Sequence, residues 1–250
     1  MQLDWIVTPG DQQRIEEFVA SREGDYLVQH RIRRNVEGVH DPITETTIWK
    51  SLVSCLLSTQ QRSGPASAIT RFQGESPFPL ALERCRSESS LSSYVTACLT
   101  DYGGIRFTEK IGRELEVNLA RLDGGLWESV ESSILRLLVP AGPALEREVA
   151  MILRASLYGI GPKQSRNLLQ ALGLTRHEIP IDSRITKWLN EFGFPVKLSA
   201  EALGDEAYYQ FVSDGIQKLC QESDVYPCVL DAAIFSSFDD GGWEDVGVIW

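Results

Sequence analysis

Two residues in the second half of the chain have the types and the spacing for amine catalysis. Lys163 ends the stretch LYGIGPK, and Asp182, nineteen positions later, follows an isoleucine and opens the stretch DSRI. An unprotonated amine attacks electrophilic carbon, and a fixed carboxylate stabilises the positive charge that develops. The pair therefore predicts nucleophilic catalysis by Lys163. A lysine that only contacts phosphate is the alternative.

A helix, a hairpin and two further helices are expected to position this pair. Apolar spacing predicts helices over 149–157 and 162–172, which places Gly159 and Gly161 in a tight turn between them. Glycine allows close approach of the backbone to a ligand, and the free N–H groups at the start of the second helix can hold a DNA phosphate without reading sequence. Asp182 begins the next apolar-periodic helix, so it is also expected to cap that helix.

The charge of the chain limits how it can meet a nucleic acid. The 250 residues carry a formal net charge of −11, which argues against a general basic surface for DNA because Lys and Arg neutralise phosphates. Residues 159–190 nevertheless have a local excess of cations, namely Lys163, Arg166, Arg176, Arg184 and Lys187. We expect a local, salt-sensitive DNA footprint there and an exposed acidic tail over 239–245. An acidic protein-interaction scaffold is the alternative.

Composition and pattern indicate an all-helical protein without a metal or another cofactor. Apolar residues recur at helical spacing in nearly every long segment, and one alternating run allows a short strand over 26–35. The five scattered cysteines and three histidines match neither a disulfide framework nor a metal site. No apolar run suits a membrane span or a signal segment. A soluble, cytoplasmic monomer is expected, associated with the nucleoid in a prokaryote.

The hairpin, Lys163 and Asp182 together resemble the catalytic signature of helix-hairpin-helix DNA glycosylases that also cleave abasic sites. The compact microbial 8-oxoguanine DNA glycosylases are the most similar. Three further stretches resemble this family: LLSTQQ at 56–61, GIRFTEK at 104–110 and LDAAIF at 230–235. The larger members carry an N-terminal sheet domain, whereas fewer than fifty residues precede Ile48 here, so we expect no base contact from such a domain. The four-cysteine iron–sulfur pattern of the endonuclease III branch does not occur in these 250 residues.

The resemblance, which runs over about 48–238, implies an all-α fold of two helical lobes with a DNA-binding cleft and no iron–sulfur cluster. One lobe would comprise 1–47 and 190–250. The other would comprise 48–189, including the helix-hairpin-helix motif at about 149–172.

The implied activity is that of a bifunctional DNA glycosylase and abasic-site lyase of base excision repair. Its partner would be double-stranded DNA with a damaged base, 8-oxoguanine above all, flipped out of the helix. Lys163 would form a Schiff base with the sugar while Asp182 stabilises the transition state, and β-elimination would follow. A glycosylase and lyase for oxidised pyrimidines is one alternative, because the lysine signature reports the reaction and not the base. A noncatalytic DNA-binding hairpin is the other.

The resemblance also assigns residues to the DNA and to the base. The implied DNA contacts are Gly159, Gly161, Gln60, Gln61, Arg62 and Arg184. Either Gln60 or Gln61 would fill the gap left by the base, and capping of the helix end is the alternative for both. Asp231 and Phe235 would border the base pocket, Asp231 at a position where the larger enzymes have Gln. A solvent-facing acid and a core aromatic are the alternatives.

Overall fold

The computed structural model describes residues 4–61, 63–139, 141–239 and 243, and all regular structure in these residues is helical. The α-helices are α1 (Pro9–Ala20), α2 (Tyr26–Arg31), α3 (Glu45–Leu57), α4 (Ala68–Gln73), α5 (Leu82–Ser87), α6 (Leu91–Tyr102), α7 (Thr108–Arg121), α8 (Trp127–Leu135), α9 (Pro143–Ser156), α10 (Pro162–Ala171), α11 (Ser183–Phe192), α12 (Glu206–Glu222) and α13 (Pro227–Ser237). Two π-helical turns, η1 (Ile32–Val36) and η2 (Leu122–Leu126), and a 3-10 turn, η3 (Ala202–Gly204), complete them. The all-α prediction is confirmed.

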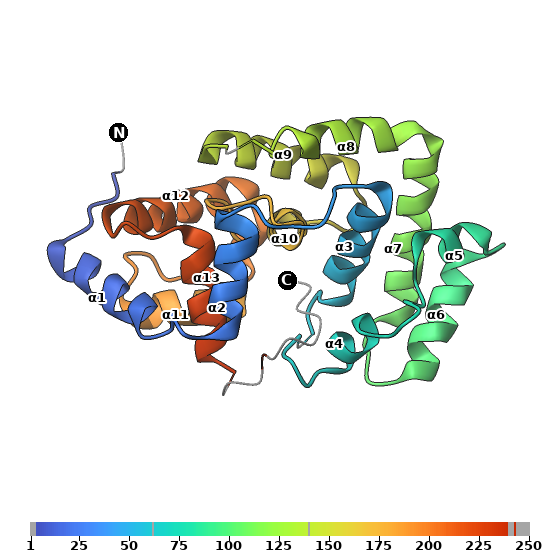
Figure 1. The fold of residues 1–250 in the computed structure, drawn as a ribbon, viewed down its shortest axis with the longest axis horizontal. Coiled ribbons are helices and arrows are strands. Elements are labelled where there is room, and N and C mark those ends of the chain that lie inside the picture. Colours follow the sequence, from blue (N-terminus) through green and yellow to red (C-terminus); the bar gives the residue numbers. More distant parts are fainter. Residues whose placement is uncertain (1–3, 62, 140, 240–242, 244–250) are drawn as a thin grey trace.

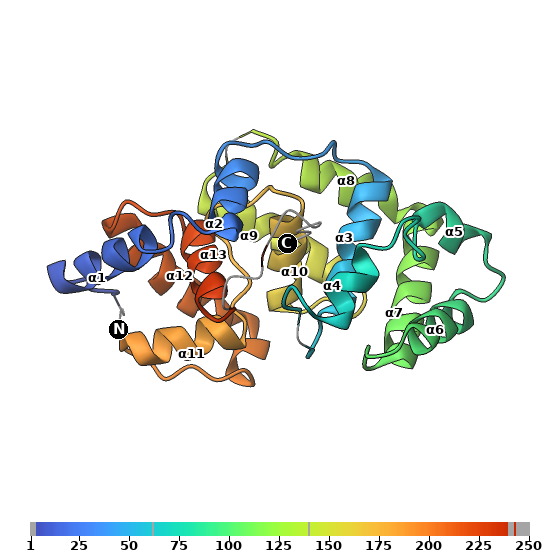
Figure 2. The same cartoon turned by 60° about the horizontal axis from the view of Figure 1, so that its bottom comes forward.

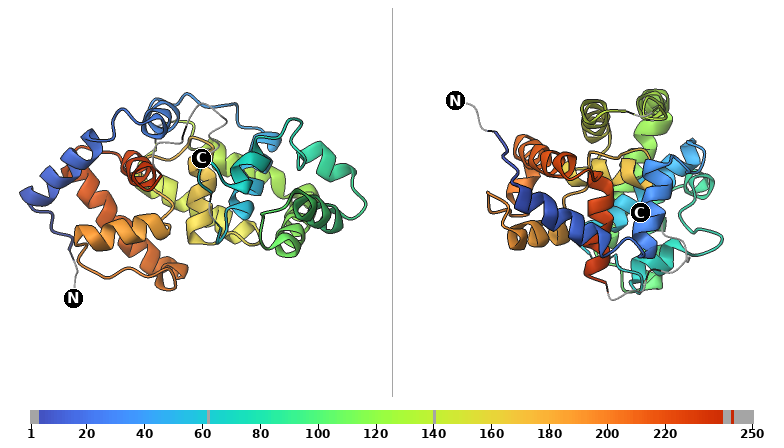
Figure 3. Two further views of the ribbon diagram at one scale, coloured as in Figure 1. Left: turned by 90° about the horizontal axis from the view of Figure 1, so that it is seen from below. Right: turned by 60° about the vertical axis from the view of Figure 1, so that its left-hand side comes forward.

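The helices form two groups on either side of α10 (Figure 1). The two ends of the chain meet in one group, where α13 packs against α1, α2, α11 and α12. In the other group, α3 packs against α5, α7 and α8, and α6 lies along α7. A view from below shows the same order, with α10 in the middle (Figure 3). The division into 1–47 with 190–250 and 48–189 stays a prediction, and the packing of α11 on α13 favours a boundary before Ser183.

Helix α3 forms the inner support of α10. Its residues from 51 to 57 are buried on every side, as expected of a helix that is apolar nearly all round. Trp49 is fully buried, and its Nε1 donates to the carbonyl of Leu80 at 2.9 Å. Two side-chain bonds from Gln164 of α10, to the Cys55 carbonyl at 2.7 Å and to Thr59 Oγ1 at 2.6 Å, join the helices. Figure 2 shows α3 beside α10. Helix α10, which carries Lys163, is therefore anchored on a buried core element.

The expectation of a strand over 26–35 is wrong. This segment forms α2 and η1. Its buried side chains are Leu27, Val28, Arg31 and Asn35, at intervals of one, three and four residues that suit a helix. The helical face packs on α13, and this tertiary contact outweighs the β-branched residues of the segment.

Three further observations concern the residues that the structure describes. The five cysteines are free, and all but Cys98 are buried. No helix has both the length and the apolar character needed to cross a membrane. In the described ranges, acids, histidines and cysteines nowhere gather in a group able to hold a metal ion.

Candidate active site

The hairpin between α9 and α10 is held by its neighbour α7. Gly159 has φ +79°, and a Cβ on it would lie 2.7 Å from Glu114 Oε1 of α7, so a side chain here would be strained and would displace the Glu114 carboxylate. Asn118 of α7 accepts from the Tyr158 N–H at 2.7 Å and donates to the Tyr158 carbonyl at 2.9 Å. Gly161 differs, because its φ is −90° and nothing lies near the position of a Cβ. The hairpin thus has one glycine required by the fold and one that leaves space in front of α10.

Lys163 lies in the first turn of α10, directly after Pro162 at the helix start. Its side chain is partly buried and lines a pocket. Asn167 and Gln170, which follow at helical spacing on the same face, line this pocket too. The free N–H groups at the start of α10 lie next to the lysine, where they suit an anion. The amine and the predicted anion site therefore share one helix end.

Asp182 caps α11, as the sequence predicts. Its Oδ1 accepts from the backbone N–H groups of Arg184 at 2.8 Å and Ile185 at 3.0 Å. Asp182 also lines the pocket that Lys163 lines. The cap bonds leave the second carboxylate oxygen for another contact, and Arg184 Nη1 is 4.0 Å from it. The carboxylate is therefore oriented by the helix it caps and borders the pocket.

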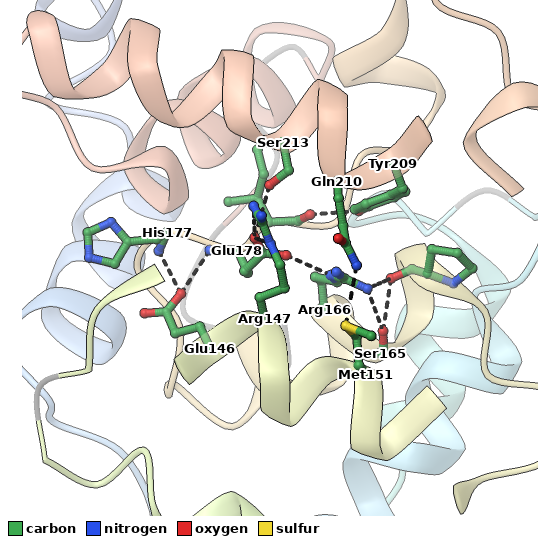
Figure 4. Close-up of polar contacts among 12 residues, drawn as sticks. Glu146, Arg147, Met151, Ser165, Arg166, His177, Glu178, Tyr209, Gln210 and Ser213 are labelled. Atoms are coloured by element: carbon green, nitrogen blue, oxygen red, sulfur yellow. Dashed lines mark hydrogen bonds and ion pairs between the residues drawn. The ribbon is translucent and has the colours of Figure 1, made fainter. Parts of the chain in front are cut away.

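The connector over 173–181, which joins α10 to Asp182, is fixed by buried polar contacts. Glu146 of α9 accepts from the backbone N–H groups of residues 176, 177 and 178 at 2.8–2.9 Å. Tyr209 of α12 donates to the Ile179 carbonyl and accepts from the Ile181 N–H, both at 2.7 Å (Figure 4). Burial raises the pKa of the Glu146 carboxyl to about 7, although the three N–H donors oppose the shift. Each half of the connector is thus anchored to a separate helix.

A buried ion pair ties this connector back to α10. Arg166, fully buried, contacts Glu178 of the connector at 2.8 Å and Glu206 of α12 at 2.7 Å. Arg147 of α9 also reaches Glu178, at 2.9 Å (Figure 4). Arg166 lies one helical turn after Lys163, so the network fixes the lysine relative to Asp182. The expectation that Arg166 belongs to an exposed DNA footprint is wrong, because its guanidinium is buried and paired with Glu178 and Glu206 inside the protein.

The pocket brings together the four residues that the sequence assigns to catalysis and to base binding. Lys163, Asp182, Asp231 and Phe235 all line it. Asp231 is buried and does not face solvent. It accepts from Gln170 Nε2 at 2.7 Å and lies 3.5 Å from Arg31 Nη1. Burial raises the pKa of the Asp231 carboxyl to about 6, against the opposing effect of the Arg31 guanidinium.

Phe235 forms a wall of the pocket and is covered in turn by charged and aromatic side chains. The Arg184 guanidinium lies 3.7 Å from the centre of the Phe235 ring, and the Trp243 ring centre is 5.6 Å away. Asp239 lies 3.6 Å from Arg184 and accepts from Trp243 Nε1 at 3.3 Å. Trp243 is only 7% exposed, so the expectation of an exposed tail is wrong at this residue. The other residues of the expected tail, 240–242 and 244–245, lie outside the described residues.

The two glutamines at the end of α3 have different environments. Gln61 accepts from the Arg106 N–H at 2.7 Å and donates to the carbonyls of Leu57 at 2.8 Å and Arg106 at 3.1 Å. Gln60 is exposed, with its backbone in the left-handed region at φ +56°. Gln61 therefore fulfils the alternative structural role, whereas the DNA contact of the exposed Gln60 stays a prediction. Arg62, the third predicted contact here, lies outside the described residues.

Sequence reasoning missed part of the cationic surroundings of the hairpin, which come from α7. Lys110 lies 3.7 Å from Glu114, the residue that packs on Gly159. Arg121 lies over the Tyr158 ring at 5.7 Å. Both cations are exposed and flank the hairpin, although they are some forty to fifty positions away in the chain. Their helical spacing on α7 is visible in the sequence, but its position beside the hairpin is not.

Comparison with known proteins addresses the fold. No protein-family model matches the chain, and a search of curated proteins finds no match. The structure resembles the 8-oxoguanine DNA glycosylase of Methanocaldococcus jannaschii, with a TM-score of 0.65 and 18% identity over 92% of this chain and 94% of that one. It also resembles that of Thermotoga maritima, with a TM-score of 0.65 and 16% identity over 92% and 97%.

A third similar structure is the M. jannaschii 8-oxoguanine glycosylase/lyase in complex with 15mer DNA that contains 8-oxoguanine. Its TM-score is 0.67, with 16% identity over 92% of this chain and 100% of that one. The likeness extends over nearly the whole length of each protein. This chain therefore has the fold of the compact microbial 8-oxoguanine DNA glycosylases, as its sequence motifs predict.

Proposed function

We propose that this protein is a DNA glycosylase of base excision repair that removes an oxidised purine, 8-oxoguanine first, and then cleaves the abasic site. One observation carries the proposal: Lys163, Asp182, Asp231 and Phe235 line one pocket next to the anion-binding start of α10. The fold adds support, since a protein of the same fold has been crystallised with DNA containing 8-oxoguanine.

In the proposed reaction, the lone pair of Lys163 Nζ attacks the sugar C1′ of a flipped nucleotide. The bond from C1′ to the base breaks, and its electron pair leaves with the base. The attached amine loses one proton, the bond from C1′ to O4′ opens with O4′ taking up a proton, and a protonated Schiff base remains. Removal of a proton from C2′ then expels the 3′ phosphate. The Asp182 carboxylate, oriented by its cap bonds, stabilises the positive charge on the sugar.

Base flipping requires groups that bind the DNA backbone and a side chain that fills the gap left in the duplex by the base. The hairpin and the start of α10 would hold a phosphate, with Lys110 and Arg121 nearby to complement its charge. Gln60, exposed at the end of α3, would fill the gap left by the base. The pocket encloses about 40 Å³, which suits a few water molecules and not a purine. Base entry therefore requires the side chains around Phe235 to move.

Borohydride trapping tests the chemistry, because reduction converts the Schiff base into a stable covalent adduct. Wild-type protein should form the adduct with a duplex containing 8-oxoguanine. Lys163→Gln should bind this duplex and form none. Asp182→Asn keeps a side chain that caps well and should lower single-turnover excision by roughly 100-fold. An active wild-type preparation that yields no adduct would refute the lyase, and unchanged activity in both variants would favour a noncatalytic hairpin.

The lesion itself is tested with duplexes that each carry one modified base. The proposal expects excision of 8-oxoguanine at a rate well above that of oxidised pyrimidines. Faster excision of an oxidised pyrimidine would show that the assigned substrate is wrong, although the proposed mechanism would still apply. Titration at low and moderate salt adds a separate check, since binding through phosphates weakens as salt rises. Absence of binding at low salt would favour the acidic scaffold.

A further inference from the structure

Two buried polar side chains in the pocket have unpaired atoms. Arg31 of α2 is 3% exposed, and its Nε and Nη1 have no hydrogen-bond partner in the described structure. Gln170 of α10 is also 3% exposed, and its Oε1 has no partner there either. Both side chains line the pocket that Lys163 and Asp182 line. Donors and an acceptor that are buried without partners thus belong to residues that border the space where a base would enter.

Unpaired buried groups of this kind lower the stability of the folded protein. A buried polar group without a partner costs about 1–3 kcal/mol, and a charged one costs more. Such groups are therefore rare in folded proteins, and two on separate helices at one pocket indicate a site for a polar ligand. Arg31 is only partly compensated, because its nearest approach to Asp231 is 3.5 Å and makes no hydrogen bond. The ligand must supply an acceptor to Arg31 and a donor to Gln170.

Asp231 lies between these two residues. Its Oδ2 is 3.5 Å from Arg31 Nη1 and accepts from Gln170 Nε2 at 2.7 Å. The three side chains therefore present a row that reads donor, acceptor, acceptor, in the order Arg31, Asp231, Gln170. The Watson–Crick edge of guanine presents the complementary row, which consists of the O6 acceptor, the N1–H donor and the exocyclic amino donor.

We propose that Arg31, Asp231 and Gln170 read the Watson–Crick edge of a guanine-derived base, with Arg31 as the donor to O6. The proposal rests on the proposed glycosylase function and names its substrate class. The base enters with its sugar toward Lys163 and its edge toward α2 and α13, and its ring packs on Phe235. Arg31 and Gln170 are specificity-determining residues, and neither takes part in bond breaking.

Other bases fit this row less well. Adenine and cytosine derivatives present an amino donor to Arg31, which has no acceptor to offer. A thymine derivative matches Arg31 and Asp231 through O4 and N3–H, but its O2 acceptor then faces the Gln170 acceptor. Only a guanine derivative satisfies all three side chains. A site with buried hydrogen-bonding groups rejects bases that leave those groups unpaired.

Two conservative variants and two substrates test this reading. Arg31→Lys keeps the positive charge beside Asp231 and removes the planar pair of donors. Gln170→Met keeps the volume and removes the acceptor. The substrates are duplexes with 8-oxoguanine or with 8-oxohypoxanthine, which lacks only the exocyclic amino group. A duplex with a preformed abasic site serves as the reference, because its cleavage needs Lys163 and no base.

Single-turnover rates give the result. Arg31→Lys should lower the ratio of 8-oxoguanine excision to abasic-site cleavage by roughly 10- to 100-fold, the effect of losing a charge-assisted hydrogen bond. Wild-type protein should prefer 8-oxoguanine over 8-oxohypoxanthine by roughly 10-fold, and Gln170→Met should remove this preference. Unchanged ratios in an active protein would overturn the inference, and so would equal losses on both reactions. A wild-type protein that cleaves neither substrate would instead refute the glycosylase function.

Discussion

The two glycines of the hairpin, which look equivalent in the sequence, should respond very differently to alanine. Gly159 has φ +79°, a left-handed conformation that costs a side-chain residue about 1–2 kcal/mol. The new Cβ would also lie 2.7 Å from Oε1 of the buried Glu114, so that this carboxylate and its pairing with Lys110 must shift. We expect Gly159→Ala to lower the free energy of unfolding by about 2–3 kcal/mol.

Gly161→Ala is the matched control. At φ −90° and with nothing close to the new Cβ, it creates no clash. Alanine caps a helix less well than glycine, but it also lowers the entropy of the unfolded chain, and each effect is below about 1 kcal/mol. The two oppose each other, so Tm should change by less than about 2 °C. The Cβ would occupy space where a phosphate approaches the start of α10, so DNA affinity should fall by roughly 10-fold.

Calorimetry and fluorescence anisotropy separate the two effects. For a chain of this size, 2–3 kcal/mol corresponds to a fall in Tm of roughly 5–10 °C, expected for Gly159→Ala alone. Anisotropy would use a duplex with a tetrahydrofuran abasic analogue, which cannot form a Schiff base. Equal falls in Tm for the two variants would refute the account of the hairpin. Full DNA affinity in Gly161→Ala would refute phosphate binding at this helix end.

Three further predictions concern other parts of the site. Arg166→Met leaves Glu178 buried without its main partner, so chemical denaturation should show a loss of about 3–5 kcal/mol, and a loss below about 1 kcal/mol would contradict the structural role. Because burial raises the pKa of Asp231 to about 6, its acceptor form prevails above that pH, and excision of 8-oxoguanine should slow as pH falls through 6. An Asp231→Asn variant should lose this step, and a step that persists would assign it to another group. Gln61→Ala, which removes three hydrogen bonds, should lower stability by about 1–3 kcal/mol, whereas Gln60→Ala should leave Tm unchanged and weaken binding to a lesion duplex.

Local rules suffice for the parts of the site that depend on neighbouring residues. The start of α10 at Pro162 and the cap of α11 at Asp182 follow from residue type and apolar spacing, and the structure shows both. The face of α10 that carries Lys163, Asn167 and Gln170 could also have been read from helical spacing. Such features involve contacts within one helical turn or two, which the sequence displays directly.

The remaining features depend on contacts between distant segments. No local pattern shows that Arg31 of α2 meets Asp231 of α13, two hundred positions later, and the alternating residues around it instead suggest a strand. The burial of Arg166 cannot be read from the sequence either, because charged residues are usually exposed. It depends on the ion pairs with Glu178 and Glu206, which offset the cost of burying the charge. Both errors concern charges paired across the fold, which composition and periodicity do not record.

The spacing of nineteen residues between Lys163 and Asp182 has a physical explanation in these paired charges. The connector between them contributes Glu178 to Arg166 of the lysine helix, and it ends in the carboxylate that caps α11. Glu146 and Tyr209 hold its two halves from α9 and α12. A shorter or longer connector would break one of these anchors before it moved the other. The buried network therefore sets where the carboxylate meets the amine, and the acidic surface of the protein has little influence on that geometry.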